Sequence, residues 1–102
     1  MIRHMVLVKA KPAVEDRAMS DIMADLSALV KTLPGAEWGI GGKSDSPERI
    51  ERGYTHAFTI DFDDWKALAD YSANPDHQAI GARLLTIVEG AREGILVMDI
   101  ES

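Results

Sequence analysis

Cysteine is absent from this 102-residue chain, and its absence excludes disulfides, thiolate nucleophiles and cysteine-based metal sites together. No apolar run approaches the ~20 residues that a membrane-spanning helix needs, and the short N-terminal run lacks the cleavage site of a signal peptide. Basic residues number 11 against 17 acidic ones, a net charge of −6, and form no cluster suited to nucleic-acid phosphates. The sequence therefore predicts an acidic, cytoplasmic protein that binds neither nucleic acid nor membranes.

The length and the apolar content are typical of one globular domain. Hydrophobic residues make up 46% of the chain, which is ordinary for a globular protein and argues against disorder. A chain of this size buries about 60–70% of the surface that its unfolded form exposes. We therefore expect a single domain over residues 1–102, with no internal repeat and no linker. No Ser-His-Asp arrangement is apparent, and Gly-Gly-Lys-Ser at residues 41–44 lacks the glycine spacing of a phosphate loop.

Apolar periodicity predicts a regular order of strands and helices. Alternation indicates four strands, at residues 2–9, 36–40, 54–62 and 95–100. Helical spacing indicates three helices, within residues 14–33, from 64 to about 72, and from 75 to about 88. Residues 41–53 have the composition of a loop. The order predicts an α+β ferredoxin-like β-α-β-β-α-β fold, whose antiparallel four-stranded sheet carries helices on one face.

The second helical region is expected to break in two. Asp63 is the expected cap of its first helix, with Trp65, Leu68, Ala69 and Ser72 on the inner face. Asn74 followed by Pro75 is a strong start for the second helix, because asparagine caps well and proline fits the first helical position.

Both faces of the first and last expected strands are apolar, although the helices can cover only one face of the sheet. The residues left facing outward are Met5, Leu7, Ala57, Leu96, Met98 and Ile100. An exposed apolar face of this size usually marks an interface, and a second copy of the sheet is its simplest cover. We therefore expect a homodimer with two sheets face to face. A monomer with an uncovered apolar face is the alternative.

Several motifs occur in order along the chain. They are R-H-M-V-L-V-K from Arg3, G-Y-T-H from Gly53, D-Y-x2-N-P-x-H from Asp70 and L-V-M-D-I from Leu96. In this combination the sequence resembles the stress-responsive dimeric α/β-barrel (Dabb) family over nearly its whole length. The resemblance implies a ferredoxin-like protomer whose sheet pairs with that of a second copy to form a barrel.

The resemblance implies an activity less firmly than it implies a fold. Many family members are known only as stress-induced proteins, whereas one member is a polyketide cyclase that performs an aldol condensation without a cofactor. The tyrosine and histidine that carry its chemistry match Tyr71 and His77 here. Asn74 stands where that motif has a further histidine. The asparagine keeps the helix cap, but the imidazole is lost. More distant barrel proteins include cofactor-independent monooxygenases.

The residues themselves suggest roles for this pair. His77 is expected near a helix N-terminus, whose dipole favours the neutral imidazole that a general base needs at pH 7. Tyr71 could donate a hydrogen bond to a substrate carbonyl and stabilise an enolate. The alternatives are a capping or core histidine and an ordinary tyrosine on the helix flank.

A pocket between the sheet and the helices is the expected binding site. Its expected lining is His4, Val6, Val8, Ile22, Met23, Leu26, His56, Phe58, Ile80, Gly81, Val88, Ile95 and Val97. The same residues would form the filled core of any ferredoxin-like domain, which is the alternative. His4, His56 and His77 would suit a metal only if they converged. For His4 and His56, buried and hydrogen-bonded side chains are the preferred interpretation.

The expected function is that of a small homodimeric barrel that binds a hydrophobic molecule. If it is an enzyme, His77 acts as base and Tyr71 as acid in a lyase or cyclase step that uses no cofactor and no metal. The alternatives are a non-catalytic, stress-associated structural dimer and a cofactor-independent monooxygenase.

Overall fold

A computed structural model describes all residues from Met1 to Ser102 and has the expected order of elements. The elements are β1 (Ile2–Val8), α1 (Asp16–Val30), β2 (Ala36–Lys43), β3 (His56–Phe62), α2 (Trp65–Ala73), α3 (Pro75–Ile87), the 3-10 helix η1 (Ala91–Gly94) and β4 (Ile95–Glu101). The four strands form one antiparallel sheet in the order β2-β3-β1-β4. The α+β ferredoxin-like prediction is therefore confirmed.

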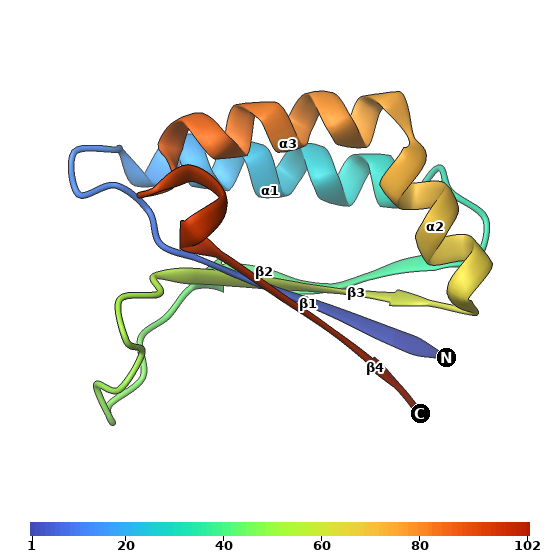
Figure 1. Ribbon diagram of the computed structural model, residues 1–102, viewed down its shortest axis with the longest axis horizontal. Coiled ribbons are helices and arrows are strands. Elements are labelled where there is room, and N and C mark those ends of the chain that lie inside the picture. The colour runs from blue at the N-terminus through green and yellow to red at the C-terminus, as the bar shows by residue number, and fades with distance from the viewer.

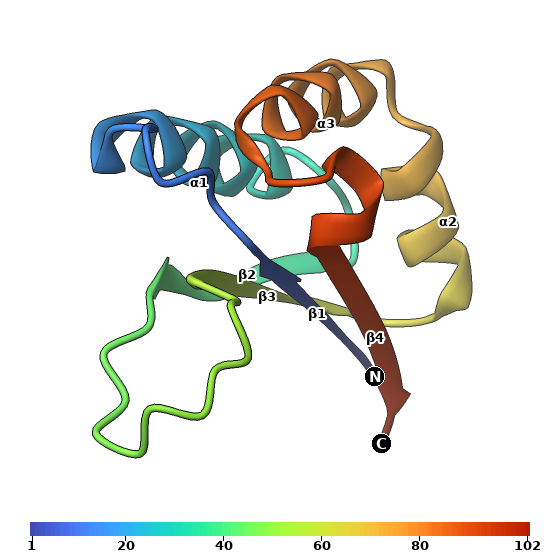
Figure 2. The same cartoon turned by 60° about the vertical axis from the view of Figure 1, so that its left-hand side comes forward.

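The helices lie on one side of the sheet (Figure 1). α1 and α3 run side by side above it, and α2 lies across its end. No helix covers the opposite side, where only the loop between β2 and β3 projects (Figure 2). No helix is both long and apolar enough to cross a bilayer.

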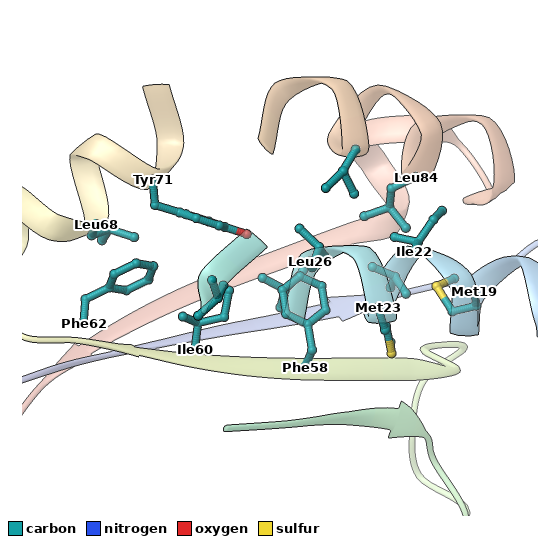
Figure 3. Packing of buried hydrophobic residues seen from close by; sticks show 14 of the residues in the cluster. Met19, Ile22, Met23, Leu26, Phe58, Ile60, Phe62, Leu68, Tyr71 and Leu84 are labelled. Carbon is teal, nitrogen blue, oxygen red and sulfur yellow. The ribbon is translucent and has the colours of Figure 1, made fainter. Parts of the chain in front are cut away.

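The core lies between this helical layer and the inner face of the sheet (Figure 3). β1 and β3 alternate as expected, so that every second side chain is buried beneath the helices. α1 contributes Met19, Ile22, Met23, Leu26 and Val30. Full burial of a side chain of this size stabilises the fold by about 1.5–3 kcal/mol. The spacing of apolar residues in the sequence predicts a buried stripe of Ala18, Ile22, Leu26, Leu29 and Leu33. The structure buries Met19 and Met23 as well, whereas Leu29 and Leu33 are only half-buried.

Strand β2 continues to Lys43, three residues beyond its expected end. A bulge between Trp38 and Gly41 interrupts its pairing with β3. Gly39 lies so close to β3 that an added Cβ would clash with the Thr59 hydroxyl, which accepts a hydrogen bond from the Ile40 amide at 3.2 Å. The glycine-rich sequence has the composition of a loop, but the small size of glycine lets β2 lie close to β3 and continue.

The N-cap and the buried face of α2 differ from those predicted by the sequence. Its N-cap is Asp64, whose carboxylate accepts a hydrogen bond from the Ala67 amide at 2.8 Å, and not Asp63. Its buried residues are Leu68 and Tyr71, whereas Trp65 is 49% exposed and Ala69 and Ser72 lie outside the core. The face differs because Tyr71 packs on Phe62 at the end of β3, with ring centroids 5.2 Å apart.

Asn74 separates α2 from α3, as the sequence predicts. Its side-chain oxygen accepts hydrogen bonds from the amides of Asp76 at 2.8 Å and His77 at 3.3 Å. Pro75 occupies the first turn of α3, where its missing N–H costs nothing.

Asn74→Ala should lower the free energy of unfolding by about 0.5–2 kcal/mol, since it removes the acceptor for two helix N–H groups. Asn74→Asp keeps a side-chain acceptor and should stay close to the wild type. Urea denaturation of the three proteins measures the difference. Equal stabilities for the alanine and aspartate variants would contradict the capping role.

Candidate functional site

A cavity of about 740 Å³ lies between α2, α3 and the inner face of β1 and β4. Its size falls within the range of small-molecule sites, roughly 300–1,000 Å³. Most of its wall is apolar, and its polar groups come from separate elements. The lining includes His4, Val6, Leu26, Phe58, Leu68, Tyr71, Ser72, His77, Gln78, Ile80, Gly81, Ala82, Leu84, Leu85, Arg92, Ile95, Val97 and Asp99.

The polar groups of this cavity form a continuous row. The ring of His77 lies 4.1 Å from that of Tyr71, and the ring of Tyr71 lies 5.9 Å from that of His4, measured between centroids. Nδ1 of His4 lies 2.6 Å from a carboxylate oxygen of Asp99, its neighbour across the β1–β4 pairing. Carboxylate, imidazole, phenol and second imidazole thus follow one another along one wall.

His77 is held in the protonation state of a base. Its Nδ1 lies 3.4 Å from the Ser72 carbonyl oxygen, which can only accept, so in the neutral ring the proton is on Nδ1 and Nε2 keeps its lone pair. Burial lowers the pKa of His77 below its ordinary 6.5, while the Ser72 contact opposes this shift and the nearby His4 adds to it. The imidazole is therefore neutral at pH 7, with burial as the main cause.

Tyr71 is held in the protonation state of an acid. The residue is only 1% exposed, and its ring extends from α2 into the space between helices and sheet (Figure 3). Burial raises the pKa of the Tyr71 phenol well above its ordinary 10.0. The Tyr71 hydroxyl bonds to no other residue, yet the protein has no fully buried polar side-chain atom without a partner. The hydroxyl is therefore not fully buried, and it faces the cavity that Tyr71 lines. It can therefore donate a hydrogen bond to a bound ligand.

Most of the expected lining residues meet in this cavity. Tyr71 and His77 line it together with His4, Val6, Leu26, Phe58, Ile80, Gly81, Ile95 and Val97. Val8, Ile22, Met23 and Val88 belong to the core but do not line the cavity. The reason is position along the elements, because these four residues lie toward the end of the sheet where β1 leads into α1.

His56 lies apart from the other histidines. It pairs with Val8, four residues along β1 from His4, which is roughly 14 Å at 3.4 Å per residue. Its Nδ1 lies 2.8 Å from the Thr55 hydroxyl oxygen, and burial lowers its pKa. No group of three or more histidine, aspartate or glutamate side chains could hold a metal ion. The three histidines therefore do not form one ligand set.

Two charged residues of the cavity, Asp99 and Arg92, were missed by the sequence analysis. A signal for Asp99 does exist, because it follows Ile95 and Val97 on the inner face of β4 and interrupts their apolar alternation. Arg92 belongs to η1, whose short irregular turn has no periodicity to interpret.

Gly81 keeps part of the cavity open. It lies in the interior of α3, where glycine costs about 0.5–1 kcal/mol relative to alanine. A Cβ added there would meet no atom within 4 Å. Neither the backbone nor close packing requires a glycine, but a large side chain at this position would project into the open space beside His77.

Comparison with known proteins decides the family. Residues 2–102 match the sequence profile described as the Stress responsive A/B Barrel Domain, Dabb. The chain belongs to the Dabb family.

Three relatives illustrate the range of this family. The stress-response A/B barrel domain-containing protein HS1 of Arabidopsis thaliana is 30% identical over 101 residues, which cover 96% of this chain and 86% of HS1. Olivetolic acid cyclase of Cannabis sativa is 24% identical over 80 residues, which cover 78% of this chain and 79% of the cyclase. A dimeric ferredoxin-like protein of unknown function from Jannaschia sp. CCS1 superposes with a TM-score of 0.90 at 29% identity, covering 99% and 98% of the two chains.

Acidification should destabilise this Dabb protein between about pH 7 and pH 5. Burial lowers the folded-state pKa of His77 and His56, so below about 6.5 the unfolded chain binds protons that the folded chain does not. Stability should therefore rise with pH across this window. Thermal denaturation at several pH values should give a shallower slope for His77→Gln than for the wild type. An unchanged slope would show that His77 titrates normally in the folded protein.

Proposed function

We propose that this Dabb protein binds a hydrophobic small molecule in the cavity and acts on it as a cofactor-free lyase or cyclase. The observation that carries the proposal is the contact between a neutral imidazole and a protonated phenol, His77 and Tyr71, in one largely apolar cavity. Similarity to olivetolic acid cyclase supports it, as does the resemblance of the D-Y-x2-N-P-x-H segment, which implies a catalytic role for Tyr71 and His77.

The proposed step begins with proton abstraction next to a carbonyl. Nε2 of His77 takes a proton from the carbon, and the electron pair of the broken C–H bond moves into an enolate. The Tyr71 hydroxyl donates a hydrogen bond to the enolate oxygen, where the negative charge develops. In a cyclase step the enolate carbon attacks a second carbonyl and forms a C–C bond. The resulting alkoxide then takes the proton back from the His77 imidazolium.

His4 and Asp99 are proposed as positioning residues. Nδ1 of His4 lies 2.6 Å from a carboxylate oxygen of Asp99, and this contact fixes the orientation of the ring. The His4 ring also packs edge-on against both Tyr71 and Phe62. This packing holds the phenol between the two imidazoles.

We also propose that the protein is a homodimer through the outer face of the sheet. Leu96, Met98 and Ile100 are 37%, 51% and 50% exposed, and the partly exposed Met5 and Leu7 lie beside them. With Ala57, these residues form an apolar face that no helix covers (Figure 2). The dimeric description of the Jannaschia protein supports a second copy of this chain as its cover.

Variants of the cavity should separate binding from chemistry. Gly81→Leu should weaken binding of a neutral fluorescent dye such as N-phenyl-1-naphthylamine by narrowing the cavity beside His77, whereas Gly81→Ala should bind it normally. With an apolar carbonyl substrate, His77→Gln should lower turnover by roughly 10²–10⁴ through loss of the base. Tyr71→Phe should lower it through loss of the hydrogen-bond donor.

Dye titration, turnover and thermal denaturation should be measured on the same samples. A wild type that binds no dye would contradict the binding function. A His77→Gln protein that melts several degrees lower and turns over substrate in proportion to its folded fraction would give His77 a structural role.

Leu7→Glu combined with Met98→Glu should convert the dimer into monomer or aggregate, because it places charges in the apolar interface. Sedimentation of the wild type at micromolar concentration should give a dimer. Lys66→Glu, on the exposed side of α2, is a matched control and should leave the dimer intact. A monomeric wild type would contradict the dimer and the barrel.

A further inference from the structure

Arg92 is the only lysine or arginine that lines the cavity. Arg3, Arg17 and Arg83 each pair with an aspartate, whereas no ion pair or hydrogen bond joins the Arg92 guanidinium to another residue. The one acid of the lining, Asp99, already accepts from His4. Arg92 is exposed to solvent, so the cavity has at its edge one cation without a partner in the chain.

The turn that carries Arg92 is firmly held. The amides of Lys9 and Glu89 bond across to the carbonyls of Gly94 and Lys9, at 2.9 and 2.8 Å, and tie both ends of the turn to β1. Ala91 has a φ of +51°, a left-handed conformation that costs a non-glycine residue on the order of 1 kcal/mol. A Cβ on Gly94 would clash with the Glu89 carbonyl, so the turn is also closely packed. The backbone of Arg92 is thus fixed at the cavity.

Apolar surface joins Arg92 to the reactive pair. Ile95 and Val97 face the cavity along β4 and lead to Asp99, a span of about 14 Å at 3.4 Å per residue. The sequence predicts that Val97 lies beneath the helices. The side chain is instead 50% exposed, because the helices do not extend over β4. A ligand lying along β4 would cover this side chain.

We propose that the ligand is an elongated apolar carboxylic acid whose carboxylate is bound by Arg92, with its chain along Ile95 and Val97 and its far end at Tyr71 and His77. This assignment of the ligand class rests on the proposed function, because it uses the same cavity. A guanidinium matches the planar fork of a carboxylate, and a single cation balances a monoanion. Glu89 and Glu93 flank the same turn but do not line the cavity. Arg92 thereby selects the ligand and sets its orientation.

Displacement of N-phenyl-1-naphthylamine by dodecanoate, dodecyl phosphate and dodecanol tests the proposal on the full chain. The wild type should bind dodecanoate most tightly. Arg92→Gln should weaken dodecanoate binding roughly 10–100-fold, the range expected of a charged hydrogen bond, and leave dodecanol binding unchanged. Arg92→Lys should restore part of the loss. Arg83→Gln, an exposed arginine of α3 outside the cavity lining, is the matched control and should bind dodecanoate as the wild type does.

The outcomes separate this proposal from the function on which it rests. Equal binding of dodecanoate to wild type and Arg92→Gln would overturn the role of Arg92. Dye binding that Gly81→Leu weakens would still support the binding function. Tighter binding of dodecyl phosphate than of dodecanoate would overturn the carboxylate assignment. Failure of the wild type to bind even the neutral dye would reject the binding function and this proposal together.

Discussion

The break between α2 and α3 is the constraint on which the site depends. Tyr71 and His77 are six residues apart, which in a continuous helix would separate them by about 9 Å along the axis and turn them to different faces. Asn74 ends one helix and caps the next, and Pro75 cannot continue the first. The chain bends there, so the two rings meet at 4.1 Å. A local helix signal thus creates a tertiary contact.

The cavity exists because the helices do not cover the whole sheet. β4 is the edge strand beside β1, and side chains on both of its faces are about half exposed. On its inner face this exposure opens the cavity toward Arg92, and on its outer face it leaves the apolar surface assigned to a second copy. Gly81 adds space from the side of α3. One uncovered strand therefore serves both the site and the proposed assembly.

Burial prepares the acid and the base by the same physical effect. An apolar environment disfavours the charged form of each group, so it lowers the pKa of the His77 imidazole and raises that of the Tyr71 phenol. Both groups are neutral at pH 7, one able to accept a proton and the other able to donate a hydrogen bond. In the proposed step, the exchange of a proton with the ligand creates charge where the phenol can stabilise it.

The sequence by itself determined the order of elements, the faces of β1 and β3, the break at Asn74 and the apolar outer face, because periodicity and capping are local properties. Only the tertiary structure decided which inward residues line open space and which are packed. Periodicity reports the face of a side chain but not its position along the sheet, so Val8 and His56 could not be separated from His4. The pairing of Asp99 with His4 depends on strand register. The place of Arg92 depends on a turn held by contacts distant in sequence, and such contacts leave no local pattern.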